Sequence, residues 1–500
     1  MRSLSTLFVG VSCEDLAFGD KFLQKPPSSD VTIDTIFSTS EYARRILWKS
    51  YQYLPYGMET SGYWTQMWLG TLEGLTDLNY DNVGYSGLAK VYYPGNYNAS
   101  IEDRKSSYPT GQRTKCRFND ADSHMWTGIR HAWLLYENVD RVPDMDATEK
   151  SRLKAEAKMI VAIYYSHMLR HFGALPIVDH AIDPEDVNLP GRATLQATVD
   201  FIIGLLNDAI NCPDFPWRIS DNDLANWDGR MTKAGAMPLK ARVLLFVASP
   251  LFNDNAPYCD GEASSSLMTW FGGYNKERWK TAVDAALDVI NACEEFFTAL
   301  NQNGYYKLVE VGDNGTSDVR GAYTSAYYDR GTTETLISVR RNILNANANS
   351  ILSNSIRWGG YCPTKEYFDM FQMSDGTDFS WDNPEQAKNP FLNRDPRLYE
   401  TFILDGDKYN GRTAALTEAL ASDPVNYPQG ADWAQGGSTH VLSLGTGLAC
   451  RKWGLDRNTE WKNRPIQWPF LRLAEIYLSY AEALNEYNGS PNAQAYDAVD

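Results

Sequence analysis

The 500-residue chain lacks any run of eighteen apolar residues, and its longest apolar stretches, such as Val243–Ala248, are far shorter. A transmembrane helix needs about 20 consecutive apolar residues, so the sequence predicts none. Basic residues are also few, since 46 Lys and Arg stand against 63 Asp and Glu and give a formal net charge of −17. Because nucleic-acid binding requires a basic surface, this balance argues against a nucleic-acid partner.

Known catalytic and metal-binding motifs are missing as well. The sequence contains no G-x-S-x-G motif, no phosphate-binding loop and no EF-hand calcium loop. His167 and His171 have the i, i+4 spacing of zinc ligands, but the segment reads H-M-L-R-H and has no Glu after the first His. We expect packed, hydrogen-bonded imidazoles there. The sequence therefore predicts no metal site, no cofactor and no catalytic residue.

The seven cysteines include no C-x-x-C pair, and their wide spacing fits no zinc site. Cys13 stands apart, because it follows a short segment, Met1–Ser12, with one Arg and the apolar stretch Leu7–Val11. This arrangement resembles the end of a bacterial lipoprotein signal, with an apolar stretch shorter than the usual range of about 7–15 residues, and it predicts that Cys13 is lipidated. The alternative is a frayed N-terminus with an incidental cysteine. For the other six cysteines we expect buried free thiols, although an exported chain could oxidise some of them.

Aromatic residues are abundant: 15 Trp, 30 Tyr and 19 Phe make up 13% of the chain. Most of these rings should be buried between helices, because they remove large apolar areas from water. A surplus in loops would suit stacking on planar or sugar-ring ligands. The apolar fraction of 43% and the charged fraction of 22% are typical of a folded globular chain. At this length we expect two lobes or one elaborated unit.

Apolar residues at spacings of three and four predict a helix at about 33–54 and a mainly helical region from about 123 to 300, with a loop-rich stretch between them at 55–120. Asp146 and Glu149 resemble a capping box that opens one long helix, which Gly173 and Pro176 end. The later stretch to residue 465 is glycine-punctuated and has short β-like runs such as Thr335–Val339. The predicted helices cover about 33–54, 124–138, 147–172, 194–211, 231–248, a segment capped by Asn275, and 469–486.

From these patterns we divide the chain into five parts. They are a signal segment at 1–12, a lipidated tether at 13–32, a helical scaffold at 33–300 with ligand-facing loops at 55–120, a loop-rich lobe at 301–465, and a return to the helical scaffold at 466–500.

A series of characteristic segments runs along the chain in a fixed order. They are Phe22–Asp30, Ile36–Phe37, Glu156–Pro176, Lys240–Asn253, Pro363–Gly376, Arg394–Leu398, Arg451–Trp453 and Leu471–Ala483. Together they resemble the SusD/RagB family of outer-membrane nutrient-binding lipoproteins of Bacteroidetes. Glu14 and Asp15 after Cys13 also resemble the surface-export signal of such lipoproteins. Family members usually continue past the last of these helices, so we expect that the sequence to Asp500 lacks a C-terminal segment.

The resemblance implies a mostly α fold with degenerate tetratricopeptide-like helix pairs and a loop-rich irregular lobe. It implies a protein held on the outer face of the outer membrane by lipid on Cys13. It further implies capture of a glycan and delivery to a SusC-like TonB-dependent transporter, with no covalent chemistry. Three alternatives remain: a peptide-capturing member of the same family, an α-helical glycoside hydrolase, and a helix-repeat scaffold that binds only a protein partner.

Loop aromatics and nearby polar side chains are the candidate ligand-binding residues, because sugars need ring faces and paired hydroxyl groups. Trp64 and Trp68, at i and i+4, fit a buried helical face better. Trp270 and Tyr274 flank two glycines before a helix, where an exposed loop and a hydrophobic staple onto Trp279 are equally compatible with the sequence. The candidates are Asp77, Tyr80, Asn82, Tyr85, Trp270, Tyr274 and Trp358.

Overall fold

A computed structural model provides the structure of the chain. It describes residues 32–55, 72–80, 93, 124–183, 185–299, 305–340, 361–409, 411–417, 419, 421–426, 428–434, 442–443, 446–454 and 467–500. Cys13, Asn82, Tyr85 and Trp358 lie outside these residues, as do Trp64 and Trp68.

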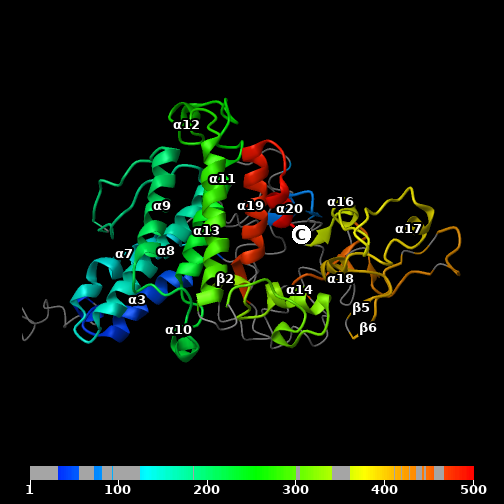
Figure 1. The fold of residues 1–500 in the computed structure, drawn as a ribbon, viewed down its shortest axis with the longest axis horizontal. Coiled ribbons are helices and arrows are strands. Elements are labelled where there is room, and N and C mark those ends of the chain that lie inside the picture. Colours follow the sequence, from blue (N-terminus) through cyan, green and yellow to red (C-terminus); the bar gives the residue numbers. More distant parts are fainter. Residues whose placement is uncertain are drawn as a thin grey trace, which may run out of the picture.

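A row of long helices forms the scaffold, and neighbours along the chain pack side by side (Figure 1). Each of the predicted long helices up to residue 299 is present, with ends close to those expected from the caps and breakers. The fold is mostly α, as predicted. The scaffold helices are α2 (Ile33–Ile36), α3 (Ser40–Gln52), α7 (Met125–Asn138), α8 (Ala147–Phe172), α9 (Leu195–Asn211), α11 (Lys233–Ala248), α13 (Glu277–Ala299), α19 (Leu473–Asn488) and α20 (Ala493–Asp497).

Local sequence explains where α8 begins and why it packs closely on α7. The Asp146 side chain accepts the backbone N–H of Glu149, as the capping box predicts, and Gly173 ends the helix with φ 71°. Gly128 of α7 lies against the Tyr164 ring of α8, and a Cβ there would collide with the phenol. The Tyr164 hydroxyl donates to the backbone carbonyl of Ser50 in α3. Three helices are thus joined at one buried phenol.

The C-terminal helix differs from its prediction. The segment Trp468–Arg472 is strand β10, which pairs antiparallel with β2 (Thr335–Val339), and α19 begins only at Leu473. Arg472 pairs with Glu334 beside β2 at 2.7 Å, and the Leu473 N–H donates to the Glu334 carbonyl. Pairing with the distant segment Thr335–Val339 therefore overrides the local helical pattern.

The remaining short elements lie mostly in the loop-rich lobe, at the right of Figure 1. Strand pairs β1–β3, β4–β9 and β5–β6 are antiparallel, and β7–β8 is parallel. The elements are α10 (Leu224–Trp227), α12 (Glu262–Ser265), α14 (Val319–Tyr328), α16 (Lys365–Asp369), α17 (Pro384–Lys388), α18 (Pro396–Thr401), β1 (Asn79–Tyr80), β3 (Cys362–Pro363), β4 (Phe402–Ile403), β5 (Lys408–Tyr409), β6 (Arg412–Thr413), β7 (Trp433–Ala434), β8 (Leu442–Ser443) and β9 (Ala449–Cys450).

The lobe has its own small core, organised around a buried arginine. Phe368, Leu398, Phe402 and Leu404 form this core. The side chain of Arg394 is only 1% exposed and donates to the backbone carbonyls of four residues around it. These acceptors are Phe368, Phe371, Gln372 and Pro390.

Among the described residues, no helix combines the length and the apolar character needed to cross a membrane. The five cysteines that the structure describes are free thiols, of which Cys293 and Cys362 are buried, whereas Cys259 is exposed. Burial raises the pKa of the Cys293 thiol to about 12, so it stays protonated at neutral pH. His167 and His171 make an edge-to-face ring contact at 4.9 Å between centroids, as packed imidazoles would.

His131 on α7 should make stability depend on pH. Desolvation by burial lowers its pKa below the ordinary 6.5, more than the Thr127 carbonyl raises it. The unfolded chain therefore binds a proton more readily than the folded chain, so stability should fall as the pH drops below about 6.5. The His131→Gln variant should lose this dependence, a change of less than about 1 kcal/mol because the ring is only partly buried. Urea unfolding across a pH series measures it, and identical pH slopes for the two proteins would contradict the assignment.

Candidate ligand-binding site

Two of the predicted site residues, Asp77 and Tyr80, lie together beside α16. Tyr80 of β1 is the register partner of Cys362 in β3. Thr364, which caps α16, donates its N–H to the Leu78 carbonyl at 3.1 Å and its hydroxyl to the Asp77 carbonyl. The ring of Tyr80 is 39% exposed, and Asp77 is exposed as well. The strand pair and the Thr364 hydrogen bonds thus hold the backbone of Asp77 and Tyr80 near the start of α16, and both side chains are exposed.

A tryptophan that is not among the residues predicted from the sequence also contacts α16. Trp381 is 42% exposed, and its indole N–H donates to Oδ1 of Asp369 at 2.8 Å. The ammonium group of Lys365 lies 4.8 Å from the ring centroid, and Phe379 meets the indole edge-on at 5.0 Å. The ring orientation is therefore fixed by polar and apolar contacts. The polar run Ser380–Asn383 is the sequence signal that this tryptophan lies in a surface loop.

We use the name α16 surface for Asp77, Tyr80, Lys365, Asp369 and Trp381. It combines two exposed rings with charged groups of both signs. Planar ring faces suit the C–H faces of sugars, and the charged groups suit hydroxyl pairs. The surface is formed by a strand pair and the short helix α16. Arg394 stabilises this helix, because it donates to the Phe368 carbonyl of α16.

Trp270 and Tyr274 lie elsewhere in the chain, between α12 and α13, and Figure 1 shows α12 at the top, far from α16. The Trp270 indole donates to the Ser264 carbonyl at 2.9 Å and is half-buried, whereas Tyr274 is 47% exposed. Trp279, the proposed staple partner, is 4% exposed. The structure therefore does not bring these two candidates together with Asp77 and Tyr80.

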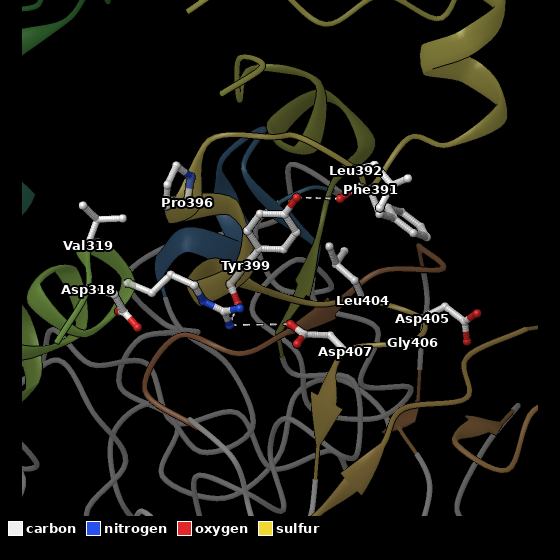
Figure 2. Close-up of a pocket in the computed structure, with 11 residues that line it drawn as sticks. Asp318, Val319, Phe391, Leu392, Pro396, Tyr399, Leu404, Asp405, Gly406 and Asp407 are labelled. Atoms are coloured by element: carbon white, nitrogen blue, oxygen red, sulfur yellow. Dashed lines mark hydrogen bonds and ion pairs between the residues drawn. The ribbon is translucent and has the colours of Figure 1, made fainter. Parts of the chain in front are cut away.

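A pocket of about 460 Å³ opens between α14, α18 and the turn before β5 (Figure 2). Tyr399 lies at its centre. Its hydroxyl donates to the Phe391 carbonyl at 2.6 Å and accepts the Arg394 N–H at 3.2 Å, so both contacts fix the ring. Leu404 and the half-buried Phe391 contribute apolar surface. None of the residues predicted from the sequence lines this pocket.

Part of the chain matches a known protein family. Residues 325–500 match the family model described as SusD family. No curated protein sequence matches the chain.

Solved structures match over most of the chain. A SusD-like protein from Bacteroides fragilis NCTC 9343 aligns with a TM-score of 0.62 and 19% identity, over 95% of this chain and 80% of that protein. A SusD-like carbohydrate-binding protein from the same strain gives 0.58 and 15%, over 91% and 75%. The surface glycan-binding protein A from Bacteroides uniformis gives 0.52 and 14%, over 92% and 79%. Residues 325–500 thus match the SusD family, and the chain has the fold of SusD-like proteins over most of its length.

Proposed function

We propose that this protein is a surface lipoprotein that captures glycans outside the outer membrane and passes them to a SusC-like TonB-dependent transporter. It acts by binding alone, without covalent chemistry. The observation that carries the proposal is the presence of two exposed rings, Tyr80 and Trp381, on a chain that has the SusD-like fold and matches the SusD family in residues 325–500. One solved relative is titled a carbohydrate-binding protein and another a surface glycan-binding protein, which supports a glycan over a peptide ligand.

Substitution of the exposed rings tests the glycan surface. Tyr80→Ala and Trp381→Ala should each weaken binding of the cognate glycan by about 1–3 kcal/mol, the range of aromatic anchors in binding sites. Neither ring belongs to a buried core, so the melting temperature should change little. Calorimetric titration with the glycan measures the effect. The predicted residues Trp270 and Tyr274 belong in the same series as Ala variants.

Matched controls are available on other faces of the chain. Trp48 on α3 is 47% exposed, and Tyr258 near α12 is 82% exposed. Trp48→Ala and Tyr258→Ala should leave the affinity unchanged. Equal losses of affinity in the controls and the site variants, or no loss of affinity in any variant, would contradict glycan binding at the α16 surface.

Anchoring is tested separately in cells. Native protein should partition with the outer membrane and incorporate labelled fatty acid, and Cys13→Ala should abolish both, because one thiol carries the lipid. Glycan binding by the purified variant should not change. A wild-type protein found in the soluble cytoplasmic fraction would overturn the lipoprotein proposal.

A further inference from the structure

The pocket around Tyr399 has a charge distribution that selects among ligands. Its cations are already matched by carboxylates. Arg320 donates from Nε to Glu400 at 2.6 Å, and its Nη2 lies 3.6 Å from Asp407 (Figure 2). Arg451, 5% exposed at its side chain, also binds Asp407, at 3.0 Å. Two arginines thus face two carboxylates, and this group carries no net charge.

Two further carboxylates at the rim of the pocket have no such match. Asp318 accepts the Gly321 N–H at 2.7 Å as the cap of α14, and Asp405 accepts the Leu416 N–H at 2.7 Å. Neither forms an ion pair with any described lysine, arginine or histidine. Both are exposed, and they lie on opposite sides of Tyr399 in Figure 2. The mouth of the pocket therefore carries an excess of two negative charges.

The floor of the same pocket is apolar and rigid. Tyr399 presents a ring that its two hydrogen bonds hold in place, with Leu404 buried beside it. The exposed side chains of Val319 and Leu392 extend the apolar surface at the rim. The volume of about 460 Å³ lies within the range of small-ligand sites. A ligand that fits must offer an apolar face to the floor and a positive charge to the rim.

We propose that this pocket is a second binding site, separate from the α16 surface, for a sugar unit that carries a protonated amine, as in a glucosamine polymer. The C–H face of the sugar ring lies on Tyr399, and the ammonium group is attracted by Asp318 and Asp405. Sugars that carry carboxylate or sulfate groups are repelled by the same two charges. The carbohydrate part of this assignment rests on the proposed function, whereas the preference for a cation rests on the rim charges alone.

The test is calorimetric titration of the wild-type protein, at a pH where the amine is protonated, with four probes. They are glucosamine oligomers, N-acetylglucosamine oligomers, galacturonate oligomers and a lysine oligopeptide. Glucosamine oligomers should bind about tenfold or more tightly than the acetylated oligomers, and added salt should weaken this binding. The galacturonate oligomers should not bind at this pocket.

Two isosteric variants locate the effect. Asp318→Asn and Asp405→Asn keep an oxygen for their backbone N–H partners, so the fold is retained. Each should weaken glucosamine binding by about three- to tenfold, because a partly exposed charge pair is lost. Asp382→Asn, an exposed carboxylate outside the pocket, is the matched control and should change nothing. Tyr80→Ala and Trp381→Ala should leave glucosamine binding intact.

Equal affinity for acetylated and free-amine oligomers would overturn the assignment. Glucosamine binding that is unchanged in both Asp318→Asn and Asp405→Asn would overturn it as well. Tight, aspartate-dependent binding of the lysine peptide in place of glucosamine would also overturn it, since the ligand would then be a peptide. Loss of binding to neutral glycans in Tyr80→Ala and Trp381→Ala, with no aspartate-dependent glucosamine binding, would refute this pocket but support the proposed function. Aspartate-dependent glucosamine binding, with unchanged binding of neutral glycans in Tyr80→Ala and Trp381→Ala, would refute the α16 surface and support this pocket.

Discussion

Replacing Arg394 with methionine should unfold the loop-rich lobe. The guanidinium group is 1% exposed and donates to four backbone carbonyls, two of them in the segment Phe368–Phe371. It also lies over the rings of Phe368 and Phe379, at 4.6 and 3.9 Å from their centroids. Methionine fills a similar volume but donates nothing, so the carbonyls lose their partners in a dry environment. Each such loss costs about 1–3 kcal/mol, and the sum should exceed about 3 kcal/mol.

Arg397 supplies the control, because it lies in the same Arg-Asp-Pro-Arg segment. Its side chain is 63% exposed, and its ion-pair partner is Asp395. Arg397→Met should cost less than about 1 kcal/mol, as exposed ion pairs do. Urea unfolding and limited proteolysis of the lobe distinguish the two variants. Similar stability of Arg394→Met and Arg397→Met would show that the buried arginine does not organise the lobe.

The second large effect is expected at a buried ion pair in the scaffold. Glu156 of α8 is fully buried, and both its oxygens accept from Arg230, at 2.5 and 2.6 Å. Tyr51 of α3 also donates to Glu156 and accepts the Met231 N–H at 2.8 Å. The carboxylate raises the pKa of Tyr51 further, although burial is the larger cause. One carboxylate thus joins α3, α8 and the segment before α11.

Glu156→Leu should therefore destabilise the protein by about 3–5 kcal/mol, because it leaves Arg230 charged and buried without its partner. The double variant Glu156→Leu/Arg230→Met should be less destabilised than the sum of the two single variants, since it removes both charges. Glu41→Gln, at the exposed pair with Arg45, is the control and should cost less than about 1 kcal/mol. Additive losses in the double variant would contradict the coupling of Glu156 with Arg230.

Features that depend on nearby residues could be predicted from the sequence. The Asp146 cap accepts the expected backbone N–H of Glu149, and α8 ends where Gly173 interrupts the pattern. The strand Thr335–Val339 is also present as predicted. These signals are local, because capping and periodicity act within one or two helical turns.

Features that depend on distant partners could not be predicted in this way. The segment at Pro469 has a helical pattern but pairs with β2, and the residues near Pro469 do not indicate that partner. Trp381 was missed because a tryptophan in a polar loop can point inward or outward, and its contacts with α16 decide the outcome. Tyr80, a predicted ligand-binding residue, is exposed, whereas the pocket around Tyr399 forms from three segments that are separate in the sequence.

The most direct test of glycan capture is migration of the soluble protein, produced from the residue after Cys13 onward, in native gels cast with plant, fungal and host polysaccharides. We expect one class of glycan to retard the protein. Retardation should be reduced in Trp381→Ala and unchanged in Trp48→Ala. Calorimetry on the retarding glycan then gives the affinity. Unchanged migration of the folded wild-type protein in every polysaccharide gel would contradict glycan capture and favour a peptide ligand.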